Sequence, residues 1–388
     1  PPLIWNMMMS MSGGWFFVVA AEAISVGNTT VTLPGVGAYI AKAIQDKNLG
    51  AIGWAIAAMA VVILIYDQLL FRPLTASADW FRLDQEAGLT PSHSWALTMM
   101  RRSRLLALGV RLFGSAIQLG FNRGREQPRP ARASGGPTRR RPLGDMAWYA
   151  VVAVVIAMAL WRITRFILDH VPLAEVGHVF ALGGFTLLRV AILIALASAF
   201  WVPIGVYIGM RPRLARTAQP IAQFLAAFPA NLLFPIVVSG IVVYKLNPNI
   251  WLSPLMVLGT QWYILFNVIV GASSLSPDLK YAGENLGVRG WLWWRKIALP
   301  AIFPFYLTGA ITASGGSWNA SVVAEVANWG TTHLHAVGLG AYIADATAAG
   351  DFPRNVLGIA VMSVIVVVVN RFFWRQLYAR AERKFRLS

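Results

Sequence analysis

The stretch Val190–Met210 reads VAILIALASAFWVPIGVYIGM and contains no charged residue. A helix needs about 20 predominantly apolar residues to cross the hydrocarbon core of a bilayer, so this stretch is long enough to do so. A soluble core helix explains one such run but not a whole set of them. We therefore predict an all-α fold, a polytopic transmembrane helical bundle with about eight spans. The other long uncharged runs are Pro1–Ala21, Asn48–Tyr66, Met146–Trp161, Thr217–Tyr244, Leu246–Pro277, Ala301–Ala324 and Asn355–Asn370.

The composition also favours a membrane protein. Hydrophobic residues make up 57% of the chain and charged residues only 13%, whereas about a quarter of a soluble domain is charged. The net charge of +17 would suit nucleic acid binding, but the cations cluster in alternate loops, as the positive-inside rule predicts for a membrane protein. The absence of Cys excludes disulfides, thiolate metal sites and cysteine nucleophiles in this chain. We assign four cation-rich segments to the cytoplasm, with both termini inside: residues 72–146, 211–216 and 280–296, and the tail after Asn370.

The beginning of the chain recurs near its end. Ser12-Gly13-Gly14 returns as Ser314-Gly315-Gly316, and the ordered matches after it include Trp and Glu. Both copies keep one order and one orientation, so we predict a parallel repeat with two halves that face each other about an axis along the membrane normal. After a one-residue shift, Trp15, Glu22, Gly27, Thr29, Gly35, Gly37, Ala38, Tyr39 and Ile40 recur as Trp318, Glu325, Gly330, Thr332, Gly338, Gly340, Ala341, Tyr342 and Ile343.

The repeat predicts three segments. Residues 1–83 form the last two spans of a first copy, and residues 146–388 form a complete second copy with six spans. The chain starts inside an apolar run, so we expect the front of the first copy to be missing. Residues 84–145 form a cytoplasmic, Arg-rich segment that ends in a Pro- and Gly-containing linker. Within it, residues 95–121 are expected to form an amphipathic helix, either on the anionic membrane surface or packed on protein.

One cytoplasmic loop carries a motif with defined spacing. Residues 281–287 read YAGENLG, and residues 297–300 read IALP. We expect a short helix broken at a glycine, and then a second helix ended by proline at the next span. Such a pair of short helices outside the bilayer, called the knuckle below and formed by residues 281–300, could transmit motion into the membrane domain. The family resemblance given in the next paragraph implies these coupling residues: Tyr281, Ala282, Gly283, Glu284, Asn285, Leu286, Gly287, Ile297, Leu299 and Pro300.

This loop resembles the "EAA" loop of permease subunits of ABC importers. The family pattern is Glu-Ala-Ala, three residues, Gly, nine residues and Ile-x-Leu-Pro. The chain departs from it at Tyr281, in place of the acid, and at Gly283, in place of the second Ala. Further stretches resemble the nitrate, sulfonate and bicarbonate branch: Leu187-Leu188-Arg189 opening a span, Pro203-Ile204-Gly205 closing it, Phe228-Pro229, Phe234-Pro235, Ala324-Glu325 and Gly338-Leu339-Gly340.

The resemblance implies a duplicated permease with the membrane-domain fold of type I ABC importers, lying in the bacterial cytoplasmic (inner) membrane. The implied partners are an ABC ATPase dimer, a periplasmic solute-binding protein and the lipid bilayer, without nucleic acid. No Gly-x-x-x-x-Gly-Lys-Ser/Thr motif occurs in the chain, so no P-loop is available to hold ATP. We expect a transport subunit rather than an enzyme. No cofactor or metal is expected, and a separate ATPase uses ATP and magnesium.

Charged residues in membrane spans are costly and are candidates for function. Arg189 is the group that would attract an anion. Glu22 and Glu325 are expected to anchor helix ends or a gate, although simple pairing or snorkelling also explains all three. His333 and His335 suit either a metal or a solvated loop, and the loop is favoured because Thr occupies both equivalent positions in the first copy. The other candidates for the translocation path or gate are Trp15, Phe228, Pro229, Phe234, Pro235, Trp262 and Trp318.

Two other functions fit a polytopic protein. An ion-coupled secondary transporter is also built from repeats and needs carboxylates deep within its spans. A membrane-embedded enzyme needs His, Asp or Glu clustered at the interface. The sequence contains neither pattern clearly, and the solute itself is not encoded in any motif.

Overall fold

The computed structural model describes residues 13–26, 29–71 and 142–385. In these ranges five helices are long and apolar enough to cross a membrane, and two bent helix pairs raise the number of candidate spans to as many as seven. The predicted polytopic helical bundle is therefore confirmed. The predicted helix over residues 95–121 and most of the segment 84–145 lie outside the described residues. Residues 142–145 already belong to α7 (Pro142–His170).

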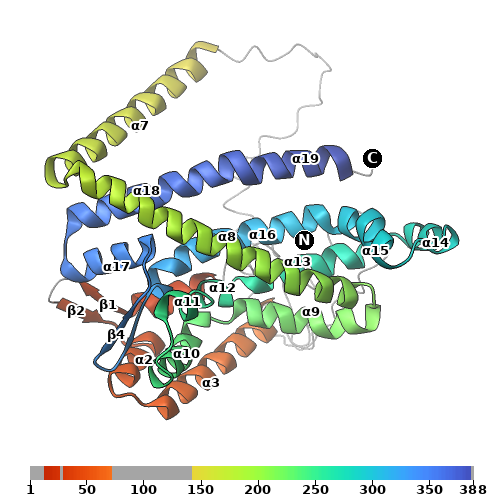
Figure 1. Ribbon diagram of the computed structural model, residues 1–388, viewed down its shortest axis with the longest axis horizontal. Helices are drawn as coiled ribbons and strands as arrows, with labels where there is room; N and C mark the ends of the chain where they lie inside the picture. Colours follow the sequence, from red (N-terminus) through yellow and green to blue (C-terminus); the bar gives the residue numbers. More distant parts are fainter. Residues whose placement is uncertain (1–12, 27–28, 72–141, 386–388) are drawn as a thin grey trace, which may run out of the picture.

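The long helices run roughly side by side along the long axis of the molecule (Figure 1). The five long candidate spans are Leu49–Leu69, Met146–His170, Leu173–Gly209, Gly290–Ala324 and Phe352–Ala381. They contain α3 (Leu49–Tyr66) with η1 (Asp67–Phe71), α7, α8 (Leu173–Gly209), α15 (Gly290–Trp293) with η4 (Trp294–Ala298) and α16 (Leu299–Ala324), and α18 (Phe352–Val369) with η5 (Asn370–Trp374) and α19 (Arg375–Phe385).

The core of the bundle is built around α13 (Gln261–Ser273), which packs against α8, α16 and α9 (Pro212–Ala227). Small residues let these backbones approach closely, as is common between transmembrane helices. A Cβ atom added to Gly309 of α16 would lie 2.6 Å from the carbonyl oxygen of Tyr263. Gly205 of α8 packs in a similar way on Val268. The buried side chains of α13 are accordingly aliphatic and aromatic.

Two candidate spans are bent rather than straight. The first consists of α9, η3 (Ala230–Leu233) and α10 (Phe234–Val243), with a bend of 78°. The second consists of α11 (Pro248–Trp251), α12 (Leu255–Leu258) and α13, with a bend of 44°. The pair Phe228-Pro229 lies at the larger bend, because Pro229 cannot continue the hydrogen-bonding pattern of α9. Pro235 occupies the first turn of α10, where a missing N–H costs nothing.

Two expected helix boundaries are wrong. The span expected to open at Leu187 and close at Pro203 is instead the continuous α8, which has Pro203 in its interior. Proline inside a transmembrane helix is tolerated when neighbouring groups compensate for the lost hydrogen bond. Pro300 does not end a helix either, since it lies in the first turn of α16 after the π-helical turn η4. The wider π-helical turn carries the helix past the proline, so residues 290–324 form one long element.

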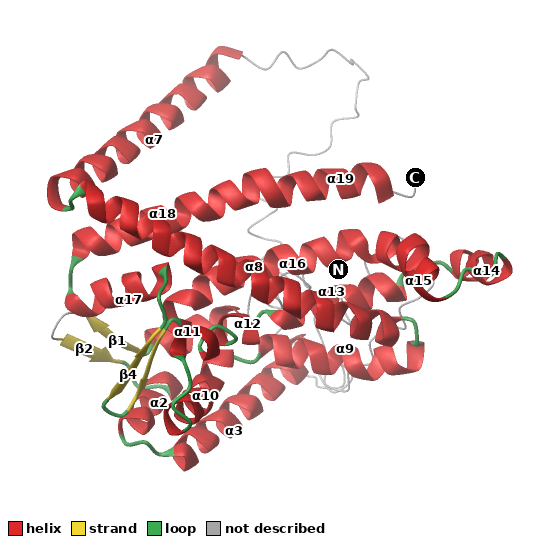
Figure 2. Ribbon diagram, in the orientation of Figure 1, coloured by secondary structure: helices red, strands yellow, loops and turns green. Residues whose placement is uncertain are grey.

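Two short hairpins depart from the predicted all-α fold (Figure 2). In the second copy, β3 (Val326–Trp329) pairs antiparallel with β4 (Thr332–His335), and Gly330 at the turn has φ of 60°. A two-residue turn with a glycine at positive φ is typical of tight hairpins. The first copy has the equivalent hairpin, β1 (Ala23–Val26) with β2 (Thr29–Thr32). Each hairpin leads into a short helix, α2 (Val36–Gln45) or α17 (Leu339–Ala349).

The hairpins and α14 (Pro277–Asn285) lie at opposite ends of the molecule (Figure 1). The predicted cytoplasmic loop is therefore far from the predicted outer helix ends. The described residues therefore contain two candidate functional sites, one at each end of the bundle.

Candidate functional site

The carboxylate of Glu325 is the centre of the site at the hairpin end. Glu325 follows α16 and is 1% exposed. Arg189 Nη1 donates to its Oε1 at 2.5 Å, and Thr186 Oγ1 donates to the same oxygen at 2.9 Å. The backbone N–H of Ala341 donates to Oε2 at 3.0 Å. A buried carboxylate is stable only with such partners, and this one ties α16 to both α8 and α17.

The acceptors at this site cap the first turn of α17. The first N–H groups of a helix have no partner within it, and they carry partial positive charge. Glu325 accepts one of them, and Thr186 Oγ1 accepts another, from Leu339 at 2.9 Å. Gly338 and Gly340 permit this approach, because a Cβ atom on Gly338 would meet the carboxylate and one on Gly340 would meet the Ser321 backbone. The Gly-x-Gly pattern is thus required for close contact rather than for unusual dihedrals.

Arg189 is held on two sides. Its side chain is 13% exposed, and its second guanidinium nitrogen donates to the carbonyl oxygen of Val337 at 3.2 Å. In this conformation its charge is matched by Glu325, so it positions the end of α16. Of the two roles that the sequence left open for Arg189, attraction of an anion and simple pairing, this conformation shows the pairing. The role of Thr186 was not predicted, because a single threonine in an apolar helix gives no signal.

The first copy repeats the arrangement in part. Glu22 accepts a hydrogen bond from the backbone N–H of Gly37 at 2.5 Å. A Cβ atom on Gly35 would meet the Glu22 carboxylate, and one on Gly37 would meet the Val19 backbone, as in the second copy. Within the described part of the chain, Glu22 has no arginine partner.

The two copies pack on each other reciprocally. Helix α17 of the second copy packs against β1 of the first, and α2 of the first packs against β3 of the second. The backbone N–H of Gly330 also donates to the carbonyl oxygen of Ile44 at 3.1 Å. Such exchange of equivalent contacts is typical of a two-fold interface. The two hairpin ends, which carry Glu22 and Glu325, therefore pack against each other.

The aromatic and proline candidates fall into two apolar clusters. Trp15 and Phe228 pack on a cluster that contains Leu232, and the Trp15 ring also meets Tyr66 edge-on at 6.0 Å. Phe234, Pro235 and Trp318 are buried, and Trp262 is half-buried with its ring 5.0 Å from that of Trp201. Phe234, Trp262 and Trp318 belong to the main core cluster. The structure thus brings these residues together as packing groups.

At the other end, α14 forms the expected short helix. Ser276 Oγ accepts from the backbone N–H of Leu279 at 3.3 Å, which caps its first turn. The chain then turns at Gly287 and Gly290, with φ of 64° and 59°. Tyr281 is 63% exposed and Leu286 is 78% exposed. Large apolar side chains exposed together outside the bundle are typical of a surface that binds another protein.

Gly283, which departs from the family pattern, is buried. A Cβ atom at this position would lie 2.6 Å from Ile297 Cδ1, so α14 packs tightly on η4 here. The backbone N–H of Val288 also donates to the Gly283 carbonyl oxygen at 2.9 Å. The remaining coupling candidates Ala282, Glu284 and Asn285 are exposed on α14, whereas Leu299 and Pro300 begin α16. The loop is thus joined directly to the helix that ends at Glu325.

A second polar cluster near α17 was not predicted. Arg354 donates to both carboxylate oxygens of Glu175, at 2.6 and 3.2 Å, and to Asp351 at 2.7 Å. The Tyr342 hydroxyl donates to Glu175 at 2.9 Å. Burial and the hydrogen bond to Glu175 both raise the pKa of the Tyr342 hydroxyl above its usual range. Tyr342 recurs as Tyr39 in the repeat, but its partners are distant in sequence and gave no pattern.

The two outer histidines lie in β4. His333 Nδ1 is 2.7 Å from Asn328 Oδ1, and His335 Nδ1 is 3.5 Å from Asp345 Oδ2. Over residues 13–26, 29–71 and 142–385, no three His, Cys, Asp or Glu side chains gather as metal ligands would. The favoured loop therefore proves to be a hairpin strand, whose histidines contact polar neighbours.

In the described residues, fold and site together define a multi-pass membrane protein with an apolar-tipped knuckle at α14 and a capping arrangement at the opposite end. Residues 201–387 match the family of binding-protein-dependent transport system inner membrane components. This match covers just under half of the chain, and over that part the chain is similar to this family of permease subunits.

Several relatives are about a quarter identical to the chain over the residues that align. The bicarbonate transport system permease protein CmpB of Synechococcus elongatus is 26% identical over 192 residues, which is 49% of this chain and 66% of the relative. The nitrate import permease protein NrtB of Leptolyngbya laminosa is 26% identical over 185 residues, 48% of this chain and 63% of the relative. The osmoprotectant import permease protein OsmW of Salmonella typhimurium is 24% identical over 208 residues, 52% of this chain and 91% of the relative. The chain thus spans slightly less than two thirds of the bicarbonate and nitrate relatives.

Proposed function

We propose that the chain is the membrane-spanning permease of an ATP-driven importer, which passes a small anion such as nitrate, sulfonate or bicarbonate into the cytoplasm. An external binding protein delivers the solute, and a separate ABC ATPase dimer supplies the energy. The protein lies in the bacterial inner membrane with both termini and α14 on the cytoplasmic side. The relatives named for bicarbonate and nitrate support this class of solute.

The observation that carries the proposal is the exposed apolar tip of α14. Tyr281 and Leu286 stand in a region that the charge pattern assigns to water rather than lipid. Exposing them to water is unfavourable, so a protein partner that covers them gains binding free energy. We propose that residues 281–287 dock in the ATPase.

Helix α16 connects the proposed docking site on α14 to the opposite end of the protein. Residues 290–324 form one continuous helical element, and at 1.5 Å per residue it is about 50 Å long. One end joins α14 through η4, and the other end is Glu325, which is bound to α8 and α17. Motion of the ATPase at α14 would therefore reach the capping arrangement on the outer side. We propose that Glu22 and Glu325 control outer closure from equivalent positions, without binding the solute.

We propose the two copies as facing halves, with residues 1–83 and 146–388 as their segments and the buried aromatic and proline residues along or beside the path. The reciprocal packing of α17 on β1 and α2 on β3 supports this arrangement. The ion-coupled alternative needs a carboxylate that exchanges a proton or cation. Glu325 suits that role poorly, because Arg189 already matches its charge.

Cysteine crosslinking tests the docking proposal, and the chain has no native Cys to interfere. Asn285→Cys should crosslink to the ATPase in the assembled complex. His333→Cys, which is exposed in the hairpin at the opposite end, is the control and should not crosslink. Deleting residues 281–287 should abolish solute-dependent ATP hydrolysis. Transport that survives the deletion, with no crosslink at position 285, would refute the proposal.

A further inference from the structure

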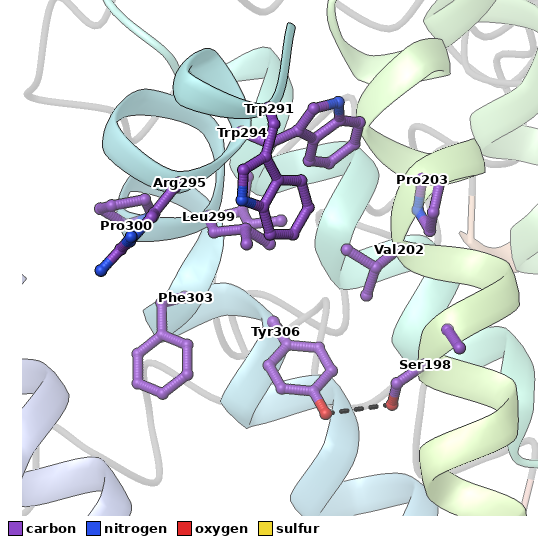
Figure 3. Close-up of a pocket in the computed structure, with 12 residues that line it drawn as sticks. Ser198, Val202, Pro203, Trp291, Trp294, Arg295, Leu299, Pro300, Phe303 and Tyr306 are labelled. Carbon is purple, nitrogen blue, oxygen red and sulfur yellow. Dashed lines mark hydrogen bonds between the residues drawn. The ribbon is translucent and has the colours of Figure 1, made fainter.

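A large cavity opens between α8 and the start of α16, away from Glu325 but beside the coupling candidates Leu299 and Pro300. Its volume is about 760 Å³, within the usual range for small-molecule sites. The lining is apolar, with Val202, Leu299 and Phe303 among its side chains. The polar exception at the far end is the hydroxyl pair of Ser198 and Tyr306, 3.0 Å apart (Figure 3).

The mouth of the cavity carries tryptophan and arginine side chains, unlike the apolar interior. Trp291, Trp294 and Arg295 lie on its rim, beside Pro300 (Figure 3). Trp291 is 74% exposed. Within the described part of the chain, the Arg295 guanidinium has neither an ion pair nor a hydrogen-bond partner. Tryptophan and arginine together are typical of the membrane–water interface, where the aromatic rings lie at the level of the lipid headgroups.

The cavity opens on the outside of the helical bundle, on an exposed face of α8. Ala199 and Pro203 of α8 line it, and both are exposed. They share a helix face with Leu196, Phe200 and Tyr207, which are 61%, 60% and 56% exposed. Residues three and four apart lie on one side of a helix. An apolar molecule in the bilayer can therefore enter from the side.

The depth of the cavity suits a hydrocarbon chain. From the rim at Leu299 to Tyr306, α16 rises by about 10 Å, at 1.5 Å per residue. A small inorganic anion would find donors only at the two ends of the cavity, at the Ser198–Tyr306 hydroxyl pair and at the rim with Arg295. A water-filled channel would need polar groups along its length, and the described lining offers them only at its two ends.

We infer that this cavity binds one anionic phospholipid, with an acyl chain between α8 and α16 and the headgroup phosphate on Arg295. Arginine is well suited to phosphate, because its planar guanidinium donates two parallel hydrogen bonds. The cytoplasmic leaflet of a membrane is rich in anionic lipids, and basic residues at its surface attract them. The assignment to this leaflet rests on the proposed orientation of α14, whereas the binding itself does not.

The location gives the lipid a way to influence transport. Trp294 and Arg295 belong to η4, the π-helical turn that joins the knuckle to α16. A lipid seated against this turn would stiffen it and would improve the transfer of motion from α14. Anionic lipid should therefore raise solute-dependent ATP hydrolysis by the assembled importer.

Binding to the purified full chain, without the ATPase, tests the site directly. Native mass spectrometry would compare phosphatidylglycerol with phosphatidylcholine of the same acyl chains. The wild type should retain phosphatidylglycerol roughly tenfold better, since the phosphate–arginine contact is charge-assisted. Arg295→Gln should remove this preference. Lys296→Gln, an equal change of charge on a neighbour that does not line the cavity, should keep it.

A second pair of variants tests the acyl chain. Ala199→Trp should fill the cavity and lower retention of both lipids at least fivefold. Phe200→Trp, next to it but outside the lining, should not. A photo-crosslinker at Leu299 should capture lipid in both the free and the assembled protein. Equal effects of Arg295→Gln and Lys296→Gln, undiminished retention by a folded Ala199→Trp variant, competition by inorganic phosphate alone, or capture of a protein chain at position 299 would each overturn the inference.

Discussion

Arg189 and Glu325 are separated by 136 residues in sequence, yet their Nη1 and Oε1 atoms lie 2.5 Å apart. The contact joins α8 to the end of α16 and, through the carboxylate, to the first turn of α17. Removing one partner of a buried pair leaves a charge with no counterpart. This pair is therefore the point at which the hairpin end should be most sensitive to substitution.

Glu325→Gln should destabilise the protein by about 3 kcal/mol, because Arg189 loses its counter-charge in a largely buried position. Thermal unfolding in detergent measures the effect. Asp278→Asn, an exposed acidic residue in α14, is the control and should change stability by less than about 0.5 kcal/mol. Equal melting temperatures for the two variants would show that the ion pair does not stabilise the fold.

The glycine at the cap gives a steric test. Gly338→Ala should destabilise the protein, because the new methyl group would displace the Glu325 carboxylate from the N-terminus of α17. Gly315→Ala is the matched control, since a Cβ atom there meets nothing within 4 Å. Alanine in that helix should stabilise it by up to about 1 kcal/mol. Opposite shifts in melting temperature are expected, and a gain in stability for Gly338→Ala would contradict the described packing.

The knuckle predicts a contrast between two glycines. Gly283→Ala should be tolerated, because the atom it meets is the flexible end of Ile297. Gly287→Ala should weaken coupling, since φ of 64° strains any residue with a Cβ atom. Solute-dependent ATP hydrolysis by the reconstituted importer should fall several-fold for Gly287→Ala and change little for Gly283→Ala. The reverse order would argue against α14 as the coupling element.

The reciprocal packing of the two copies predicts that their glutamates act together. Glu22→Gln and Glu325→Gln should each reduce transport, and the double variant should differ from the sum of their free-energy effects by at least about 0.5 kcal/mol. Transport rates at saturating binding protein would measure this coupling. Strict additivity would separate the two residues and would place them at independent sites.

Much of the architecture follows from local pattern. The apolar runs and the glycine after residue 286 depend on neighbours in sequence, so the membrane-spanning helices and the short helix α14 could be predicted. The helix bounds around Pro203 and Pro300 could not, because a proline breaks a helix in water but is accommodated in a packed transmembrane bundle. The sequence also could not predict the ion pairs Arg189–Glu325 and Glu175–Arg354. Each pair depends on how helices that are distant in sequence pack together. The hairpins were missed because four-residue strands give too short a signal.

Uptake into proteoliposomes tests the central claim most directly. The complete permease, reconstituted with its ATPase and binding protein, should accumulate radiolabelled nitrate or bicarbonate only when ATP is inside with the ATPase and the binding protein is outside. The variant lacking residues 281–287 should show none of this accumulation. Uptake driven by a proton or sodium gradient without ATP, at the same rate in both proteins, would contradict the account and favour an ion-coupled transporter.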